Sequence, residues 1–320
     1  MPPSTNPPGF IRSYDPIKDA EEVIRLIEKS FNLQNDPESR NVINQMRLNS
    51  QRLREGGWLF NPGTINPGFV WVIDNRIVGN INILFFFENL KQIALIANVA
   101  VQPEYQKMGI ATSLTKHALR FIKHKRAAEI WLQVSGENQA ARKMYSDLGF
   151  QFIRRINCWS KEGQFTRRVQ TPLPDRQSFS WGPRRIGDWS FQKGCLEGLY
   201  PKDTRWYSSL KFNLFSPFSI LNPLNWDDLD ALQHFALRKE KKLIGILSLQ
   251  KQLSRSDNLW FALRQDENEE EYLNTLLTIF LEREWSGRPL RVEYPDKHCE
   301  KVFKSLAFHL VRRLDWMKYK

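Results

Sequence analysis

The strongest constraint on the fold is an internal repeat that relates the two halves of the chain. Segment 132–156 aligns without a gap to segment 290–314, at an offset of 158 residues. Both copies share a Leu-x-Val start, a lysine, a leucine, a phenylalanine and a closing pair of arginines. A second match joins 75–84 to 241–250 and places Gly79 opposite Gly245. Such self-similarity is the signature of a duplicated unit, so we predict two copies of one fold in tandem.

Length and composition fit two globular domains. The chain has 320 residues, of which 41% are hydrophobic, enough for two cores. No apolar run approaches the ~20 residues of a membrane helix, and the N-terminal MPPSTNPPGF lacks the pattern of a secretory signal. Three scattered cysteines make neither a disulfide framework nor a zinc site. We therefore expect a reduced, cytoplasmic protein with no metal and no membrane contact.

The net charge of +12 is divided equally between the two halves. Because there is no block of five or six like charges, we do not expect nucleic acid as a partner. A basic surface suits a phosphate-bearing ligand or an acidic partner. Nothing in the sequence indicates an oligomeric state.

The first half combines helical and strand patterns. Asp15-Pro16 predicts a helix start, with an N-cap acid and a proline at the first helical position. The other expected elements are a helix from Pro37 to about Gly56, a hairpin over 69–87, a buried strand over 93–101, a helix from 110, a strand over 129–134 and a helix over 138–148 ended by Gly149. This order indicates a mixed α/β layer fold.

Residues 160–190 have little periodicity and several Pro, Gly and Arg residues, as in an exposed arm. We therefore predict a first domain over 1–160, an arm or linker over 161–185 and a second domain over 186–320.

A polar loop between the strand over 93–101 and the next helix suits an anion. A helix N-terminus exposes backbone N–H groups without helical partners, and the helix dipole favours negative charge there. Gly109 lets the backbone approach a ligand, Lys107 adds charge, and Thr112 and Ser113 add hydroxyl donors. The alternative is an ordinary glycine turn before a surface helix.

Two motifs around this loop resemble the GNAT acetyltransferases. Residues 106–111, QKMGIA, match the family's Q/R-x-x-G-x-G/A signature between a strand and a helix. Downstream, Asn138, Ala141 and Tyr145 match its N-x-x-A-x-x-x-Y pattern, and Leu148-Gly149-Phe150 matches its L-G-F ending. The resemblance covers about residues 10–160. It implies an α/β (α+β) fold: two tandem GNAT-type domains, each a mixed, mostly antiparallel sheet flanked by helices, with splayed central parallel strands.

The resemblance also implies a site for acetyl-CoA between the splayed strands. Tyr145 would be the general acid that protonates the departing CoA thiolate, a role for which a phenol has a suitable pKa. The implied cofactor-binding residues are Asn98, Val99, Ala100 and Val101 along the pantetheine arm, Gln106, Lys107, Met108, Gly109, Ile110, Ala111 and Thr112 around the pyrophosphate, and Asn138 and Ala141 beside the pantetheine. A tyrosine packed in the core is the alternative for Tyr145.

The general base is not assigned by the sequence. One branch of the family has W-L-E-V on the fifth strand, whereas this chain has Trp131-Leu132-Gln133-Val134, and an amide cannot take the proton. Some relatives carry a glutamate near position 98, which is Asn98 here. Glu88 and Glu137 are candidates whose simpler interpretation is solvated surface charge.

The second half has lost the residues of this site. At the offset of 158, Tyr145 becomes Phe303, Asn138 becomes Asp296 and Gly149 becomes Ala307. The phosphate loop falls on 264–273, RQDENEEEYL, whose carboxylates would repel a pyrophosphate. We therefore predict that the C-terminal domain is a degenerate copy without cofactor and with a structural role.

Together these features predict an acetyltransferase that moves the acetyl group of acetyl-CoA to a primary amine by direct attack. The acceptor is a protein or peptide amine, or a small amine metabolite. The alternative is a non-catalytic acyl-CoA-binding or interaction protein.

Overall fold

The computed structural model describes residues 8–31, 37–55, 67–88, 90–163, 179–201, 203, 206–207, 212–219, 231–252, 256–264 and 266–320. The chain divides into two compact units. The first comprises Met1–Arg154 together with Leu314–Lys320, and the second comprises Arg155–Arg313. Within the described ranges, no helix is long and apolar enough to cross a membrane.

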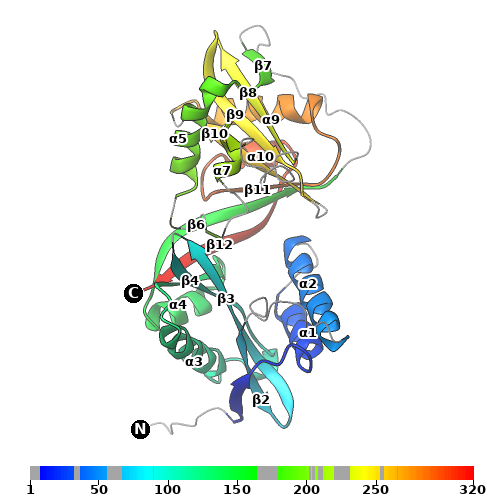
Figure 1. Cartoon of the computed structure of the whole chain (residues 1–320), viewed down its shortest axis with the longest axis vertical. Coiled ribbons are helices and arrows are strands. Elements are labelled where there is room, and N and C mark those ends of the chain that lie inside the picture. The colour runs from blue at the N-terminus through cyan, green and yellow to red at the C-terminus, as the bar shows by residue number, and fades with distance from the viewer. Residues whose placement is uncertain are drawn as a thin grey trace. The chain divides into compact units, whose positions relative to one another are not determined.

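The first unit contains a mixed sheet with helices on both faces (Figure 1). Its strands run in the order β1-β2-β3-β4-β5-β12, and all adjacent pairs are antiparallel except β4 with β5. The bounds are β1 Phe10–Ser13, β2 Gly68–Ile73, β3 Arg76–Glu88, β4 Lys91–Val101, β5 Glu129–Ser135 and β12 His309–Tyr319. The helices are α1 Ala20–Ser30, α2 Pro37–Arg54, the short 3-10 turn η3 Pro103–Tyr105, α3 Ile110–His124 and α4 Gln139–Asp147. This confirms the predicted mixed α/β fold.

Two hydrophobic clusters define the two faces of this sheet. The larger cluster packs α3 and α4 onto one face and includes Leu114, Leu132 and Tyr145. The other packs α1 and α2 onto the opposite face through Ile24, Ile27 and Ile43, against side chains that include Val70 and Ala100. Successive residues of a strand point to opposite faces, so each strand contributes different side chains to the two clusters.

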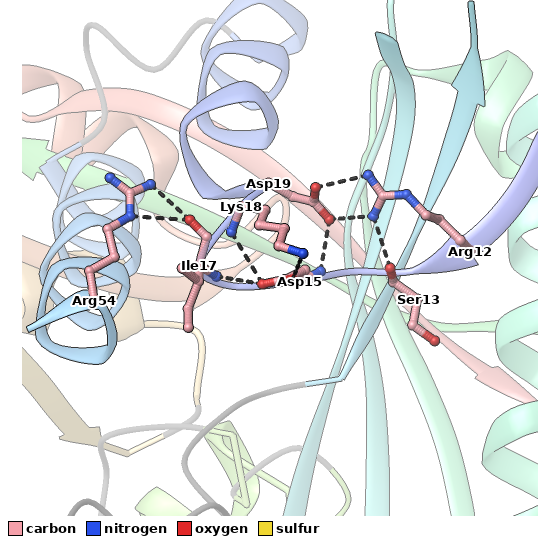
Figure 2. Close-up of polar contacts among 7 residues, drawn as sticks. All are labelled: Arg12, Ser13, Asp15, Ile17, Lys18, Asp19 and Arg54. Atoms are coloured by element: carbon pink, nitrogen blue, oxygen red, sulfur yellow. Dashed lines mark hydrogen bonds and ion pairs between the residues drawn. The ribbon is translucent and has the colours of Figure 1, made fainter. Parts of the chain in front are cut away.

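The predicted helix start at Asp15 is wrong by four residues, because α1 begins at Ala20. Asp15 instead accepts hydrogen bonds from the backbone N–H groups of Ile17 and Lys18, which forms a turn before the helix (Figure 2). Asp19 does not cap the helix with its side chain. Its carboxylate accepts from the Arg12 guanidinium and from the Asp15 N–H, and so joins β1 to the start of α1.

The hairpin and the later elements of the first half follow the sequence predictions. Asp74 and Asn75 form the tight turn between β2 and β3 with φ of 47° and 60°, a backbone region that Asn and Asp tolerate. Gly149 ends α4 with φ of 99°.

The second unit has the same succession of elements as the first. Its sheet order is β6-β11-β10-β9-β8-β7, with β10 and β11 parallel. The strands are β6 Phe150–Lys161, β7 Phe179–Pro183, β8 Leu232–Lys239, β9 Lys242–Gln250, β10 Asp257–Leu263 and β11 Leu290–Pro295. The helices are η4 Ile186–Asp188, α5 Trp189–Leu199, α7 Phe212–Phe215, α9 Glu269–Arg283 and α10 Glu300–Ser305.

The two halves of the sequence exchange their last strands. The end of β12 pairs with β5, with Leu314 opposite Ser135 and Lys318 opposite Trp131. The end of β6 pairs with β11, with Lys161 opposite Leu290. These strands occupy the same place in the repeat, 150–156 against 308–314, so each can complete the other unit's sheet. The sequence predicts one boundary, at residue 160, between two continuous domains. The compact units instead divide after Arg154, and the first unit also includes Leu314–Lys320 from the end of the chain.

The offset of 158 does not extend through the strand-to-helix loop. Between β4 and α3 the chain runs from Val101 to Ile110, whereas between β10 and α9 it runs only from Leu263 to Glu269. The second unit therefore has a shorter loop. The residue before its helix is Asn268, and the offset would have predicted Glu267 there.

Candidate active site

The parallel strands β4 and β5 pair over a short distance and then separate. Their register runs from Ile93 opposite Glu129 to Ile96 opposite Leu132, and no pairing is described beyond these residues. Past this point β4 continues against β3, with Ala100 opposite Asn80. The β5-facing edge of the end of β4 therefore offers backbone groups that the described part of β5 does not bind.

The loop at the end of β4 presents a set of backbone donors. Gly109 lies in the left-handed region with φ of 83°, and a Cβ built there would meet no atom within 4 Å. The N–H groups from Lys107 to Thr112 donate to no backbone acceptor in the described structure, while the Ser113 N–H bonds to the Gly109 carbonyl. Glycine fits here because its left-handed backbone points successive N–H groups outward. This donor set fits a diphosphate at a helix N-terminus.

Two glutamines hold this loop in place. The Gln106 side chain donates to the Val101 carbonyl at 3.1 Å, so its role is to bind the loop to β4. Gln102 was not predicted from the sequence. Its side chain donates to the Ile77 carbonyl at 2.8 Å and its N–H donates to the Val78 carbonyl. The sequence feature that could have identified Gln102 is its position directly after a buried strand, where a polar side chain can bond to the neighbouring strand.

Helix α4 carries the other predicted residues. Asn138 is its N-cap, and the side-chain oxygen accepts from the Ala141 N–H at 3.0 Å. Tyr145 is 5% exposed and packs edge-on against Phe150, with ring centroids 5.9 Å apart. Burial raises the pKa of the Tyr145 phenol above its usual value of 10, so the hydroxyl stays protonated at neutral pH.

One hydrophobic cluster brings six of the fourteen predicted site residues together. Val101, Ile110 and Tyr145 belong to it, and Val99, Ala111 and Ala141 pack against it. Met108 is an exposed loop residue. Ala100 belongs instead to the cluster on the opposite face of the sheet. Asn98 lies in a bulge of β4 and bonds to the side chain of Asn82.

The structure adds residues from the end of the chain that the sequence analysis did not place here. Asp315 of β12 is fully buried, and its carboxylate lies 2.8 Å from Nε of Arg142 on α4. Tyr319 packs edge-on against Phe150 and accepts a hydrogen bond from Lys123. The last strand therefore fixes α4, and with it Tyr145, against the sheet.

Of the positions considered for a base, 98 and 133 hold neutral amides, and the two glutamates lie elsewhere. Gln133 lies on β5 between Leu132 and Val134, which face α4, so its side chain projects to the opposite face. Glu88 is at the end of β3, opposite Lys91 and away from the strand separation. Glu137 is exposed in the turn before α4.

In the second unit, aromatic side chains pack where β10 and β11 separate. These strands pair from Asp257 opposite Leu290 to Leu259 opposite Val292. Phe303, the counterpart of Tyr145, is fully buried and packs against Tyr294 and Phe261. Glu269, at the first position of α9, accepts a hydrogen bond from the Tyr294 hydroxyl at 2.8 Å.

Comparison with known proteins agrees with this geometry. A sequence profile of the acetyltransferase (GNAT) family matches residues 31–150. The N-alpha-acetyltransferase of Saccharolobus solfataricus is 31% identical over 114 residues, which cover 33% of this chain and 68% of that protein.

Two solved structures share the fold over nearly the whole chain. A GCN5-related N-acetyltransferase from Sphaerobacter thermophilus is 13% identical with a TM-score of 0.57, over 97% of this chain and 94% of that one. A tandem GNAT protein from the clavulanic acid biosynthesis pathway is 12% identical with a TM-score of 0.50, over 97% of each chain. The chain therefore belongs to the GNAT family of acetyltransferases and is an N-acetyltransferase.

Proposed function

We propose that the first unit transfers the acetyl group of acetyl-CoA to a primary amine. The observation that carries the proposal is the separation of β4 and β5 after Ile96 and Leu132, next to the donor-rich start of α3. A separated pair of parallel strands leaves backbone groups for an extended ligand, and the helix start supplies donors for its phosphates. The family profile over this region supports the same donor class.

The donor would be held mainly by backbone. The N–H groups from Lys107 to Thr112 would bind the pyrophosphate, with the Lys107 side chain adding charge. The end of β4, from Val99 to Val101, would pair with the pantetheine amides. Asn138 and Ala141 would line the other side, where the Asn138 cap fixes the first turn of α4.

Tyr145 would serve as the general acid. Attack by the amine breaks the C–S bond of the thioester, and the phenol gives its proton to the departing thiolate. Because burial raises the pKa of Tyr145, the phenol is fully protonated when the reaction begins. Arg142 lies one helical turn before Tyr145, and its contact with Asp315 would hold this helix during the transfer.

The acceptor we favour is the α-amine of a protein or peptide. The support is the Saccharolobus relative, an N-alpha-acetyltransferase, which is 31% identical over 114 residues of this chain. A small amine metabolite is the competing acceptor. A screen of peptides and small amines for CoA release distinguishes the two.

The Tyr145→Phe variant tests the proposal. We expect the turnover number to fall by about 10²- to 10⁴-fold, because a positioned general acid contributes on this scale. Calorimetry should show unchanged affinity for CoA, since the ring is retained. The matched control is Tyr105→Phe, a half-buried tyrosine of η3 beside the loop, which should keep full activity. Undiminished turnover in Tyr145→Phe would remove Tyr145 from the reaction. CoA binding with no transfer to any amine would favour a binding protein.

A further inference from the structure

Three asparagines, of which Asn80 and Asn82 are buried and Asn98 is half-buried, form a carboxamide cluster at the point where β4 leaves β5. Asn80 and Asn82 lie on β3, and Asn98 lies in a bulge of β4. The Asn80 amide group donates to Asn82 Oδ1 and to the Asn98 carbonyl, both at 3.0 Å. The Asn98 amide group donates to the same Asn82 oxygen at 3.1 Å. The bulge begins two residues after Ile96, the last β4 residue paired with β5.

The backbone at this bulge is held in an unusual conformation. Ala97 lies opposite Asn82 and Ala100 lies opposite Asn80, so two β4 residues stand against one β3 residue. Asn98 has φ of 51°, in the left-handed region. Such conformations persist only where surrounding contacts enforce them, and here both the Asn98 side chain and its carbonyl are bonded to the other two asparagines.

One oxygen of the cluster is a hydrogen-bond acceptor without a donor among the described residues. Asn80 is fully buried, and its Oδ1 finds no donor among the described residues. The orientation of the amide is set by its neighbours, because a flipped amide would turn its oxygen toward the two acceptors that its nitrogen now serves. A buried carbonyl without a donor is costly, so such a group calls for a partner.

The cluster lies on the face of the sheet opposite Tyr145. Asn80 is in register with Val70 and Ala100, which belong to the cluster that packs against α1. Gln133 projects to this same face across the strand separation, and all four carboxamides are neutral. The polar side chains at the strand separation on this face are therefore carboxamides and not carboxylates.

The second unit has a closed polar group at the corresponding place. Ser248 follows Gly245 by three residues, as Asn82 follows Gly79. The Ser248 hydroxyl accepts from Gln192 at 2.9 Å and lies 2.8 Å from Nδ1 of His234. The Ser248 hydroxyl is therefore bonded to its neighbours, whereas Asn80 Oδ1 of the first unit has no donor among the described residues.

Building on the proposed function, we infer that the Asn80–Asn82–Asn98 cluster binds the acceptor amine, with Asn80 Oδ1 accepting an N–H hydrogen bond. A neutral amide orients the amine without removing its proton. The amine therefore binds productively in its unprotonated form, after its proton has passed to bulk water. The nitrogen then bonds to the acetyl carbon as the C–S bond breaks, and the departing thiolate takes the Tyr145 proton. The proton that the acylated nitrogen sheds passes to water, from which Tyr145 is reprotonated.

This chemistry selects among amines by pKa. At pH 7 about a tenth of an α-amine with a pKa near 8 is unprotonated, against about one in 2,500 of lysine side chains with a pKa near 10.4. Without a strong base, the site should favour a free N-terminus over lysine by about 250-fold at pH 7, from these fractions alone.

Kinetics with two peptide probes test this inference. One is a decapeptide with a free N-terminal alanine and no lysine, and the other is the same peptide acetylated at its N-terminus and carrying one lysine. Wild-type kcat/KM for the first should rise with pH and level off near the pKa of its α-amine. Gln133→Glu, which places a carboxylate across the strand separation, should move that rise to lower pH. The inference that the site holds no base would be refuted if wild-type kcat/KM levelled off well below the α-amine pKa, or if the two peptides had equal kcat/KM.

Variants of Asn80 test the contact itself. Asn80→Ser and Asn80→Leu should raise KM for the peptide by about tenfold, the effect of one lost hydrogen bond, with KM for acetyl-CoA unchanged. A crystal structure of the CoA complex that resolves water should show an ordered water or amine on Asn80 Oδ1. If that oxygen is dry, or both variants leave peptide KM unchanged, the role of Asn80 is refuted. Failure of the wild type to acetylate either peptide would instead contradict the peptide acceptor of the proposed function.

Discussion

The contact between Arg142 and Asp315 should be a strong side-chain link between α4 and the last strand. The Asp315 carboxylate is fully buried, and one of its oxygens lies 2.8 Å from Arg142 Nε. The Arg142 side chain is 36% exposed, so it can turn toward water if its partner is removed. The two single variants should therefore differ in cost.

Breaking a buried ion pair by removing one partner costs about 3–5 kcal/mol when the remaining charge stays buried. Arg142→Met should approach the lower end of this range, about 3 kcal/mol, because it leaves the buried carboxylate without this guanidinium. Asp315→Asn should cost less, about 1–2 kcal/mol, because the arginine regains solvent. The double variant should be less destabilised than the two single costs together, with a coupling energy of about 1–2 kcal/mol.

Native-state hydrogen exchange of the β5 amides is the assay, because β5 pairs directly with β12 and reports opening of the first unit. The matched control is Lys143–Asp147 on the same helix, whose atoms lie 3.3 Å apart with side chains 78% and 62% exposed. That exposed pair should couple by about 0.3–0.5 kcal/mol. A coupling between Arg142 and Asp315 no larger than this would refute the idea that burial strengthens the contact.

Two further predictions concern the loop before α3 and the second unit. Gly109→Ala places a side chain at φ of 83° with no atom to strike, so it should lower stability by about 1 kcal/mol through backbone strain. It should also weaken CoA binding in calorimetry, while Gly187→Ala, equally open and without a left-handed φ, changes neither. Burial, followed by the charge of Arg184, lowers the pKa of His234 to about 3. This histidine stays neutral when folded but gains a proton below about pH 6.5 when unfolded, so stability present above pH 6.5 is lost as pH falls toward 3. By pH 5 the loss should be about 2 kcal/mol, and urea unfolding across this range should show a smaller loss in His234→Gln than in the exposed control His124→Gln. Equal pH dependence in the two variants would exclude His234 as the source.

Much of the first unit could be predicted from local pattern. The Asp74-Asn75 turn, the glycine before α3 and the Asn138 cap each follow from a backbone requirement that few residue types meet. The start of α1 could not, because the Asp19 carboxylate bonds to Arg12 on a different element. The unused Asn80 oxygen was also invisible, since it depends on a bulge in the neighbouring strand.

The sequence by itself determined that the fold is duplicated, that the first copy carries the loop signature QKMGIA at 106–111, and that positions 98 and 133 hold amides. These properties depend on residue identity and short-range spacing. Only the tertiary structure decided which strand completes which sheet. β6 and β12 are equivalent strands of the repeat, so their sequence patterns would allow either of them to pair with β5. The choice is made by long-range contacts, such as Trp316 against Trp131 and Asp315 with Arg142.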